Sequence, residues 1–162
     1  MPSEEPRQEP MLRIERDFAH SISKLWQAWI DPDRLLLWFG PEHAPARDII
    51  ADVRKGGDWR ACLENDETGS RLYVSGRYEE IIPEKRLVFS FRWEGDTHED
   101  GAGVDTLVTV EFIALAAGRS RLVLTQVGFV SQDSADGHAR GWSSCLDRLE
   151  MSLGSHAPSI VV

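Results

Sequence analysis

The sequence of 162 residues predicts an α+β fold, in which a curved antiparallel sheet of about seven strands packs around one long C-terminal helix. Two short helices are expected after the first strand. The prediction rests on three observations. Short runs that alternate apolar and polar residues fill the middle of the chain, turn residues separate these runs, and a single long stretch with helical periodicity follows them.

The N-terminal segment, residues 1–10, contains three prolines and three glutamates and is predicted to be a disordered leader. A period-2 alternation of apolar and polar residues begins at Met11 and predicts the first strand. We expect a single domain over residues 11–154, followed by a C-terminal tail over residues 155–162.

Two short helical segments follow the first strand. Ser21 or Ser23 can cap the first helix, and Pro32 ends it because the residue before a proline avoids the helical region. A second helix covers residues 33–39 and stops at Gly40. These segments carry apolar side chains that can pack on the sheet.

Six strand-like runs make up most of the remaining chain. On one phase their residues are apolar and often aromatic, whereas the alternate positions are rich in arginine and hydroxyl groups. One face of the sheet is therefore expected to be covered and the other to face water. The six runs span residues 47–54, 58–65, 71–82, 86–94, 104–115 and 121–130.

The last segment, residues 134–153, predicts a helix long enough to span the domain. Its apolar residues recur every three or four positions and form one stripe, which is expected to cover the apolar face of the sheet. The stripe comprises Ala135, Ala139, Trp142, Leu146, Leu149 and Leu153.

Charge and cysteine usage exclude several classes of function. With 27 acidic and 18 basic residues the net charge is -9, which opposes binding to nucleic acid or to an anionic membrane. No signal peptide and no long apolar run appears, so a cytoplasmic protein is expected. Cys62 and Cys145 lack metal-ligand spacing and are expected to be isolated reduced thiols. We expect no cofactor and no metal.

Several strings of the sequence, in this order, resemble one known family. They are LLWFGP at residues 36–41, VRKGGDW at 53–59, GRYEEIIP at 76–83, RLVFSF at 86–91, LVTVEF at 107–112, LVLTQ at 122–126 and Gly141-Trp142. Residues 11–153 resemble the domain of the activator of heat-shock protein 90 ATPase family, within the START-like (SRPBCC) superfamily. The resemblance implies the helix-grip fold, with a cavity between the sheet and the C-terminal helix.

Inward-facing residues are the candidates for lining such a cavity, and the sequence leaves open whether they form a closed core or an open pocket. Two of them are polar. Gln126 could hydrogen-bond a ligand or bond to backbone or water, and Tyr78 could present its phenol to a ligand or find a backbone acceptor. The candidates are Trp38, Phe39, Trp59, Val74, Tyr78, Phe89, Phe91, Trp93, Val110, Phe112, Leu124, Gln126, Trp142, Leu146 and Leu149.

No local catalytic motif is found, and no catalytic residue is assigned. The cluster at residues 98–100 (His-Glu-Asp) lies in an acidic, glycine-flanked loop and is not expected to hold a metal. Gly56-Gly57 is predicted to be a hairpin turn rather than a phosphate cradle, because no helix follows it.

Three functions compete at this point. The leading one is a binding module for a small hydrophobic or aromatic ligand. The resemblance alone suggests the second, an interaction with a chaperone through the outer surface. The third is a cyclase or hydrolase that uses the same cavity, and it ranks last because no residue is an evident general base. The oligomeric state, monomer or homodimer, stays open.

Overall fold

The structure, a computed structural model, describes residues 9–95 and 104–154. Within these residues seven antiparallel strands form one sheet in the order β1-β7-β6-β5-β4-β3-β2. The predicted α+β helix-grip architecture is confirmed. The elements are β1 (Met11–Phe18), α1 (Ile22–Ile30), α2 (Pro32–Trp38), β2 (Ala46–Ala51), β3 (Asp58–Glu64), β4 (Arg71–Ile82), β5 (Arg86–Trp93), β6 (Thr106–Ala116), β7 (Arg119–Val127) and α3 (Gln132–Gly154).

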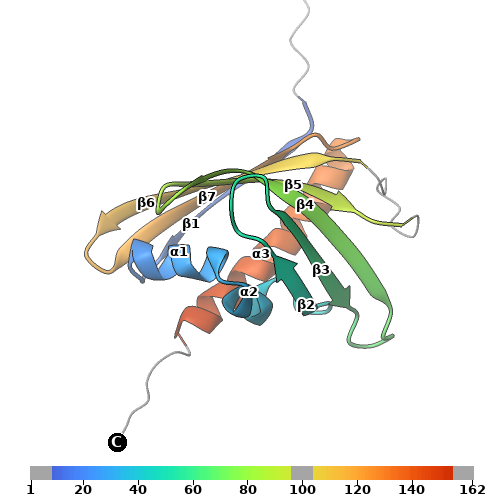
Figure 1. The fold of residues 1–162 in the computed structure, drawn as a ribbon, viewed down its shortest axis with the longest axis horizontal. Coiled ribbons are helices and arrows are strands. Elements are labelled where there is room, and N and C mark those ends of the chain that lie inside the picture. Colours follow the sequence, from blue (N-terminus) through green and yellow to red (C-terminus); the bar gives the residue numbers. More distant parts are fainter. Residues whose placement is uncertain (1–8, 96–103, 155–162) are drawn as a thin grey trace, which may run out of the picture.

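The sheet arches over α3, and α1 and α2 lie beside that helix on the same concave side (Figure 1). The inward phase predicted for the strands is confirmed, since Leu87, Phe89 and Phe91 of β5 are all buried. The predicted stripe of α3 is buried too, apart from the half-buried Ala139. Burial of these two apolar faces against each other drives the fold.

The two short helices begin where side chains can cap them. The hydroxyl of Ser21, not Ser23, accepts a hydrogen bond from the Lys24 amide at 3.2 Å. The carboxylate of Asp31 accepts from the Asp33 amide at 3.0 Å, and Pro32 occupies the first turn of α2. The second helix therefore starts one residue earlier than predicted.

The last strand ends earlier than predicted, at Val127 rather than residue 130. Gly128 has a φ of +98°, which interrupts the extended backbone. Phe129 then turns inward, and its ring lies 4.8 Å from that of His138 on α3. α3 also starts before the predicted residue 134, because the Ser131 hydroxyl accepts a hydrogen bond from the Ser134 amide.

The turn between β2 and β3 needs both of its glycines. Gly56 has a φ of +84°, and a Cβ at Gly57 would collide with the carbonyl of Asp52. The hairpin-turn interpretation of this pair is therefore confirmed.

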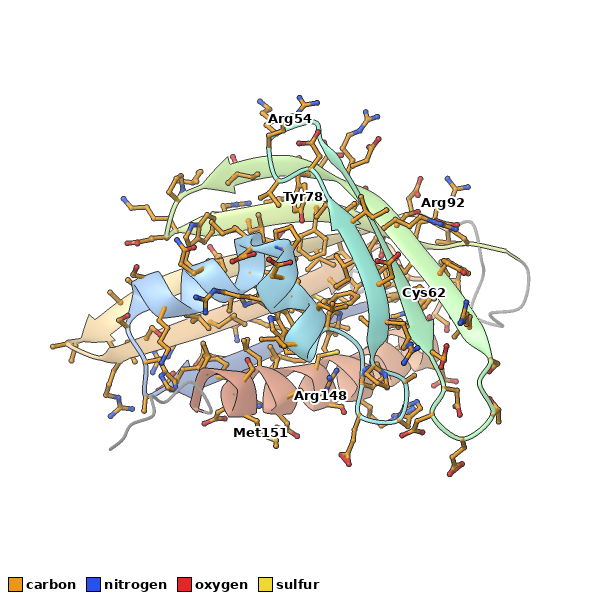
Figure 2. All side chains as sticks on the ribbon, turned by 60° about the horizontal axis from the view of Figure 1, so that its bottom comes forward. Arg54, Cys62, Tyr78, Arg92, Arg148 and Met151 are labelled. Atoms are coloured by element: carbon orange, nitrogen blue, oxygen red, sulfur yellow. The ribbon has the colours of Figure 1, made fainter. Side chains whose placement is uncertain are left out.

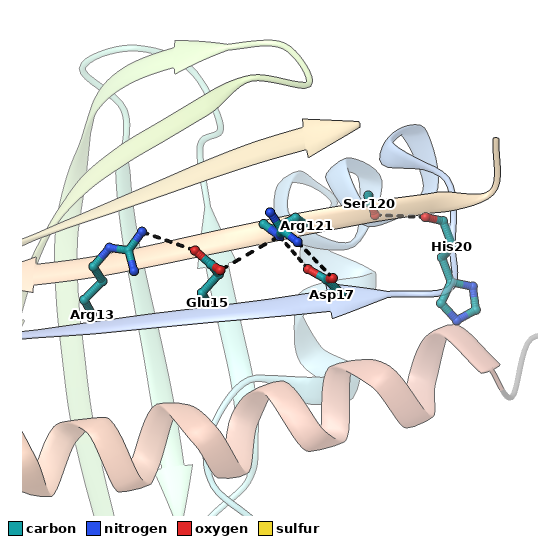
Figure 3. Close-up of polar contacts among 6 residues, drawn as sticks. All are labelled: Arg13, Glu15, Asp17, His20, Ser120 and Arg121. Atoms are coloured by element: carbon teal, nitrogen blue, oxygen red, sulfur yellow. Dashed lines mark hydrogen bonds and ion pairs between the residues drawn. The ribbon is translucent and has the colours of Figure 1, made fainter. Parts of the chain in front are cut away.

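Ion pairs on the convex face join the first strand to the last one (Figure 3). Arg121 of β7 lies 2.7 Å from Asp17 and 4.0 Å from Glu15 of β1. The Ser120 hydroxyl donates to the His20 carbonyl at 2.9 Å. The hydrogen bond from Arg121 holds the pKa of the exposed Asp17 carboxyl below its usual range.

Among the described helices, none is long and apolar enough to cross a membrane. The predicted leader up to residue 8, the cluster at residues 98–100 and the predicted tail lie outside the described residues.

Candidate functional site

The larger hollow on the concave side, which we call the outer pocket, has a volume of about 500 Å³. It lies between strands β3 to β5, the loop after α2 and the first half of α3. Its wall is mostly apolar and aromatic, which is typical of a small-molecule site. The outer pocket is lined by Phe39, Gly40, Pro41, His43, Ala44, Leu63, Leu72, Val74, Phe91, Trp93, Gly137, His138, Arg140, Gly141, Trp142, Ser144 and Cys145.

A second, smaller hollow, which we call the inner pocket, lies between the two short helices and strands β2 to β5 and has a volume of about 30 Å³. That space holds at most a water molecule or two. Phe39 lines both hollows and therefore stands between them. The inner pocket is lined by Trp29, Leu35, Phe39, Ile49, Ala51, Trp59, Ala61, Tyr78, Leu87 and Phe89.

The backbone of Phe39 is held on both sides. Its amide donates to the Leu35 carbonyl at 2.8 Å, and its carbonyl accepts from the Ala46 amide at 2.9 Å. Its ring lies about 6 Å from the rings of Trp59 and Trp142.

Arg148 of α3 fastens the end of α2 to the wall of the outer pocket. Its guanidinium donates to the carbonyls of Phe39 at 3.0 Å and Gly40 at 2.8 Å, and also to those of Leu37 and Trp38. Figure 2 shows Arg148 on the side of α3 that meets α2, whereas Met151 points outward. Arg148 thus supplies donors to carbonyls that have no partner within α2 itself.

His138 is the main polar group of the outer pocket, and its hydrogen bonds define its tautomer. Nδ1 lies 2.8 Å from the Ser134 carbonyl, which can only accept, so Nδ1 carries the proton. Nε2 then accepts from the indole N–H of Trp93 at 2.9 Å. The imidazole is therefore engaged through both nitrogens.

The other polar groups of the outer pocket are spread around it. The Ser144 hydroxyl accepts from the Glu42 amide at 2.9 Å. Arg140 is exposed, and no carboxylate of the described residues lies within ion-pair distance of it. The Cys145 thiol is buried, and burial raises its pKa to about 12 against the opposing effects of the Gly40 backbone and Arg148. It is therefore a neutral thiol rather than a nucleophile at physiological pH.

Gln126 lies beyond the outer pocket in a closed relay of hydrogen bonds. Its Oε1 accepts from the Trp142 indole at 2.7 Å, and its Nε2 donates to the Thr106 hydroxyl at 2.8 Å. That hydroxyl donates to the Phe91 carbonyl at 2.9 Å. The amide thus bonds to two side chains, rather than to the ligand or to the backbone or water considered from the sequence.

Two polar groups that line the inner pocket lie outside any such relay. The indole N–H of Trp29 is buried and has no hydrogen-bond partner among the described residues. Tyr78 is also buried, and desolvation raises its pKa to about 12. Figure 2 shows Tyr78 extending from β4 toward the side of the sheet that carries α1 and α2.

The predicted candidates divide into three groups. Phe39, Val74, Phe91, Trp93 and Trp142 line the outer pocket. Phe39 also lines the inner pocket, together with Trp59, Tyr78 and Phe89. The structure places the remaining candidates in the packed core away from both hollows; they are Trp38, Val110, Phe112, Leu124, Gln126, Leu146 and Leu149.

Sequence reasoning missed several pocket residues. His138 precedes Trp142 by four positions and so shares its face of α3, a signal that was available. Gly137 and Gly141 leave space beside the same face. Trp29 lines the inner pocket and His43 the outer pocket because segments that are distant in the chain meet there. No local sequence pattern predicts these two positions.

The convex face of the sheet carries a broad, open groove of about 1020 Å³. Charged side chains line it, and they pair with one another, as Arg60 does with Glu94 at 3.0 Å. Among the described residues no group of three or more histidine, cysteine, aspartate or glutamate side chains could hold a metal. The concave pockets are the stronger candidate site.

Comparisons with known proteins agree with this architecture. The model of the family described as "Activator of Hsp90 ATPase homolog 1-like protein" matches residues 19–154. A search of curated proteins returns no match.

Solved structures from several bacteria are similar to the chain. A crystal structure from Silicibacter pomeroyi, named for the same family, is 28% identical with a TM-score of 0.77 and covers 91% of this chain and 99% of its own. An uncharacterized Rhizobium leguminosarum protein is 26% identical with a TM-score of 0.75, and the match covers 92% of this chain and 97% of that protein. An Arthrobacter aurescens protein, 20% identical with a TM-score of 0.79 and coverages of 94% and 90%, shares the fold.

Proposed function

The chain belongs to the family of activator of Hsp90 ATPase homolog 1-like proteins, and from that premise we propose that it binds a small, mostly apolar ligand in the outer pocket. One observation carries the proposal. A hollow of about 500 Å³, walled by aromatic and aliphatic side chains, opens between the sheet and α3. Its volume lies in the range of small-molecule sites, and a few polar groups at its edge can orient a ligand.

Binding is favoured over catalysis by the state of the polar groups. His138 already uses both ring nitrogens, and burial keeps the Cys145 thiol protonated. A general base or a nucleophile needs a free lone pair near the substrate. The pocket therefore has the character of a receptor site.

Filling the outer pocket tests the proposal. Gly141 lies on the pocket side of α3, and a Cβ at this position would meet no atom within 4 Å. Gly141→Phe should therefore occupy the hollow, and replacing a helical glycine should not weaken α3. Gly141→Ala is the matched control, because it changes helix propensity and fills little space.

The measurement is native mass spectrometry together with thermal-shift screening against fatty acids, flavonoids and aromatic polyketides. We expect a compound that binds and stabilises the natural chain and Gly141→Ala to lose at least tenfold in affinity for Gly141→Phe. Equal binding to all three proteins would place the ligand elsewhere and overturn the proposal.

Chaperone binding stays a prediction that rests on family membership alone. A pull-down with the middle domain of heat-shock protein 90 tests it independently of the outer pocket, because Gly141→Phe leaves the convex face unchanged.

A further inference from the structure

The hairpin of β6 and β7 ends in a run of exposed apolar residues. Ile113 is 42% exposed and Leu115 is 40% exposed. Hairpin turns are usually built from glycine, proline, asparagine, aspartate or serine, and an uninterrupted apolar run in such a place calls for an explanation. We call residues 113–119 the hairpin tip. The exposed apolar run within it consists of Ile113, Ala114, Leu115, Ala116 and Ala117.

The hairpin tip extends past the strands beside it. β5 begins at Arg86, which pairs with Glu111 of β6, and β1 ends at Phe18, which pairs with Ser120 of β7. Among the described residues, no strand therefore pairs with the outer edges of residues 113–119. Figure 1 shows this end of the hairpin beyond α1, at one end of the molecule. The hairpin tip lines neither of the two pockets.

A lysine lies near each side of the base of the hairpin tip. The Ser120 hydroxyl donates to the His20 carbonyl at 2.9 Å, which holds the start of α1 beside β7, and Lys24 belongs to the first turn of that helix. On the other side, the Phe112 amide donates to the Lys85 carbonyl at 2.9 Å. Both lysines are therefore close to the level at which the apolar run begins.

The local charge differs from that of the whole chain. Arg119 and the two lysines have no carboxylate of the described residues within ion-pair distance, whereas Arg121 is paired with Asp17. Two carboxylates, Glu84 and Glu111, lie in the same region, so a small excess of positive charge remains. The net charge of -9 opposes contact with an anionic membrane. Salt screens charges over about 8 Å, however, so a surface that touches the tip responds mainly to the groups around it.

The size and shape of the hairpin tip decide between its possible partners. A stable interface with a folded protein, a second copy of this chain included, takes about 20–30 residues from each side. The tip is much smaller than that, and it projects rather than forming a flat face. A lipid bilayer needs only a few projecting aliphatic side chains that enter the acyl boundary, with basic groups at the level of the headgroups.

We propose that the hairpin tip inserts into the surface of a lipid bilayer, with Ile113 and Leu115 against the acyl chains and Arg119 at the lipid phosphates. The contact is peripheral. It is independent of the proposed function, because the tip lies outside both pockets.

Co-sedimentation of the full chain with vesicles tests the inference. The vesicles contain phosphatidylcholine and phosphatidylglycerol in a ratio of seven to three, at physiological salt. We expect the natural chain to bind, and the double variant Ile113→Asp/Leu115→Asp to bind about tenfold more weakly, because carboxylates resist transfer into the acyl boundary. Both replaced side chains are exposed, so thermal unfolding should stay close to that of the natural chain.

The matched control is Val130→Asp. Val130 is 59% exposed and follows β7 at the end opposite to the hairpin tip. This variant should bind vesicles as the natural chain does. Arg119→Gln should weaken binding to the mixed vesicles about fivefold and change binding to pure phosphatidylcholine little, since it removes one charge from the headgroup level.

Nuclear magnetic resonance locates the contact. In ¹⁵N-labelled protein, bicelles of the same lipids should shift the amide signals of residues 113–119 and leave that of Val130 unchanged. A natural chain that stays in the supernatant at millimolar lipid would overturn the inference, and so would equal binding of the Ile113→Asp/Leu115→Asp variant.

Two further results separate the alternatives. If the natural chain dimerises in sedimentation velocity without lipid, and Leu115→Asp abolishes the dimer, the tip binds a second copy and the inference is wrong. Gly141→Phe should leave vesicle binding unchanged, so the membrane contact and the ligand site stand or fall separately.

Discussion

The core has two ends that treat their buried polar groups in opposite ways. Around β6, β7 and the middle of α3, the side chains of Thr106, Gln126 and Trp142 satisfy one another in a relay that ends on the Phe91 carbonyl. We call this the closed end. At the hollow end, formed by the two pockets, the Trp29 N–H lacks an acceptor among the described residues and Tyr78 lies buried beside unfilled space.

The contrast agrees with the function that we propose for the outer pocket. At the closed end, the sequence supplies hydrogen-bond partners for both polar atoms of the buried Gln126 amide, and such a satisfied network stabilises the core. Leaving a donor unmatched at the other end lowers stability without a structural return. The difference is in keeping with the ligand site that we propose for the outer pocket, because functional sites are where local stability is given up.

The largest expected effect compares two leucines, one at each end. Leu146 is fully buried in the closed end, and Leu63 lines the outer pocket. Leu146→Ala should destabilise the fold by an amount near the top of the usual range of about 2–5 kcal/mol, and Leu63→Ala near its bottom, because Leu63 already faces a hollow. Urea unfolding of the two variants measures the difference. Equal losses would mean that the outer pocket is as tightly packed as the core.

Alkaline unfolding gives the next effect. Tyr78 has a pKa of about 12 in the folded protein, above the ordinary value of 10.0, so the folded state holds the phenol proton more tightly than the unfolded state. Stability is therefore full below pH 10 and falls as the pH rises through about 12, by roughly 2–3 kcal/mol in total.

Tyr78→Phe is the control for this titration, because it removes the phenol and keeps the ring. The pH dependence of urea unfolding should flatten in this variant. If the natural chain and Tyr78→Phe lose stability in parallel above pH 10, then solvent reaches Tyr78 and the hollow end is wetter than its walls indicate.

Breaking the relay should have a somewhat smaller effect. Gln126→Leu leaves the buried Trp142 N–H without its acceptor and should cost about 1–2 kcal/mol. Trp142→Phe removes that donor, so in the Gln126→Leu background it should cost less than it does alone. A double-mutant cycle measures this coupling, and additive losses would show that the relay contributes nothing of its own.

The smallest expected effect lies on the convex face, away from both ends. Asp17→Asn removes the exposed partner of Arg121. Because the folded-state pKa of Asp17 is lowered, its contribution is present near neutral pH and disappears as the pH falls through that pKa. Thermal unfolding should show a slight loss near pH 7 and none in strong acid. A loss that is independent of pH would point to a packing defect instead.

Much of the fold was predictable because its signals are local. Alternation placed Trp59, Phe89 and Phe91 on the inward phase, and helical spacing put Trp142 and Leu146 on one stripe. Element ends were less certain, as Gly128 and Ser131 show, because a single glycine or hydroxyl decides where a strand stops or a helix starts.

The site was only partly predictable. Phase assigned Tyr78 and Gln126 equally to the interior, but it could not tell that one would lie beside a hollow and the other inside a relay. That distinction depends on the two partners of Gln126. Thr106 lies 20 positions before it in the chain and Trp142 lies 16 positions after it, on a different element. The position of Phe39 on the lining of both hollows likewise depends on contacts between distant segments, since its ring lies near Trp59 of β3 and Trp142 of α3.

The hydrogen bonds of Arg148 have a consequence for the order of assembly. They join residues that are 108 to 111 positions apart in the chain. On the ribosome, the end of α2 is made early but lacks these donors until α3 has been synthesised and released from the exit tunnel. The wall of the outer pocket is therefore completed only after α3 has been made, and a nascent chain that stalls before residue 148 lacks the hydrogen bonds that hold the end of α2 in place.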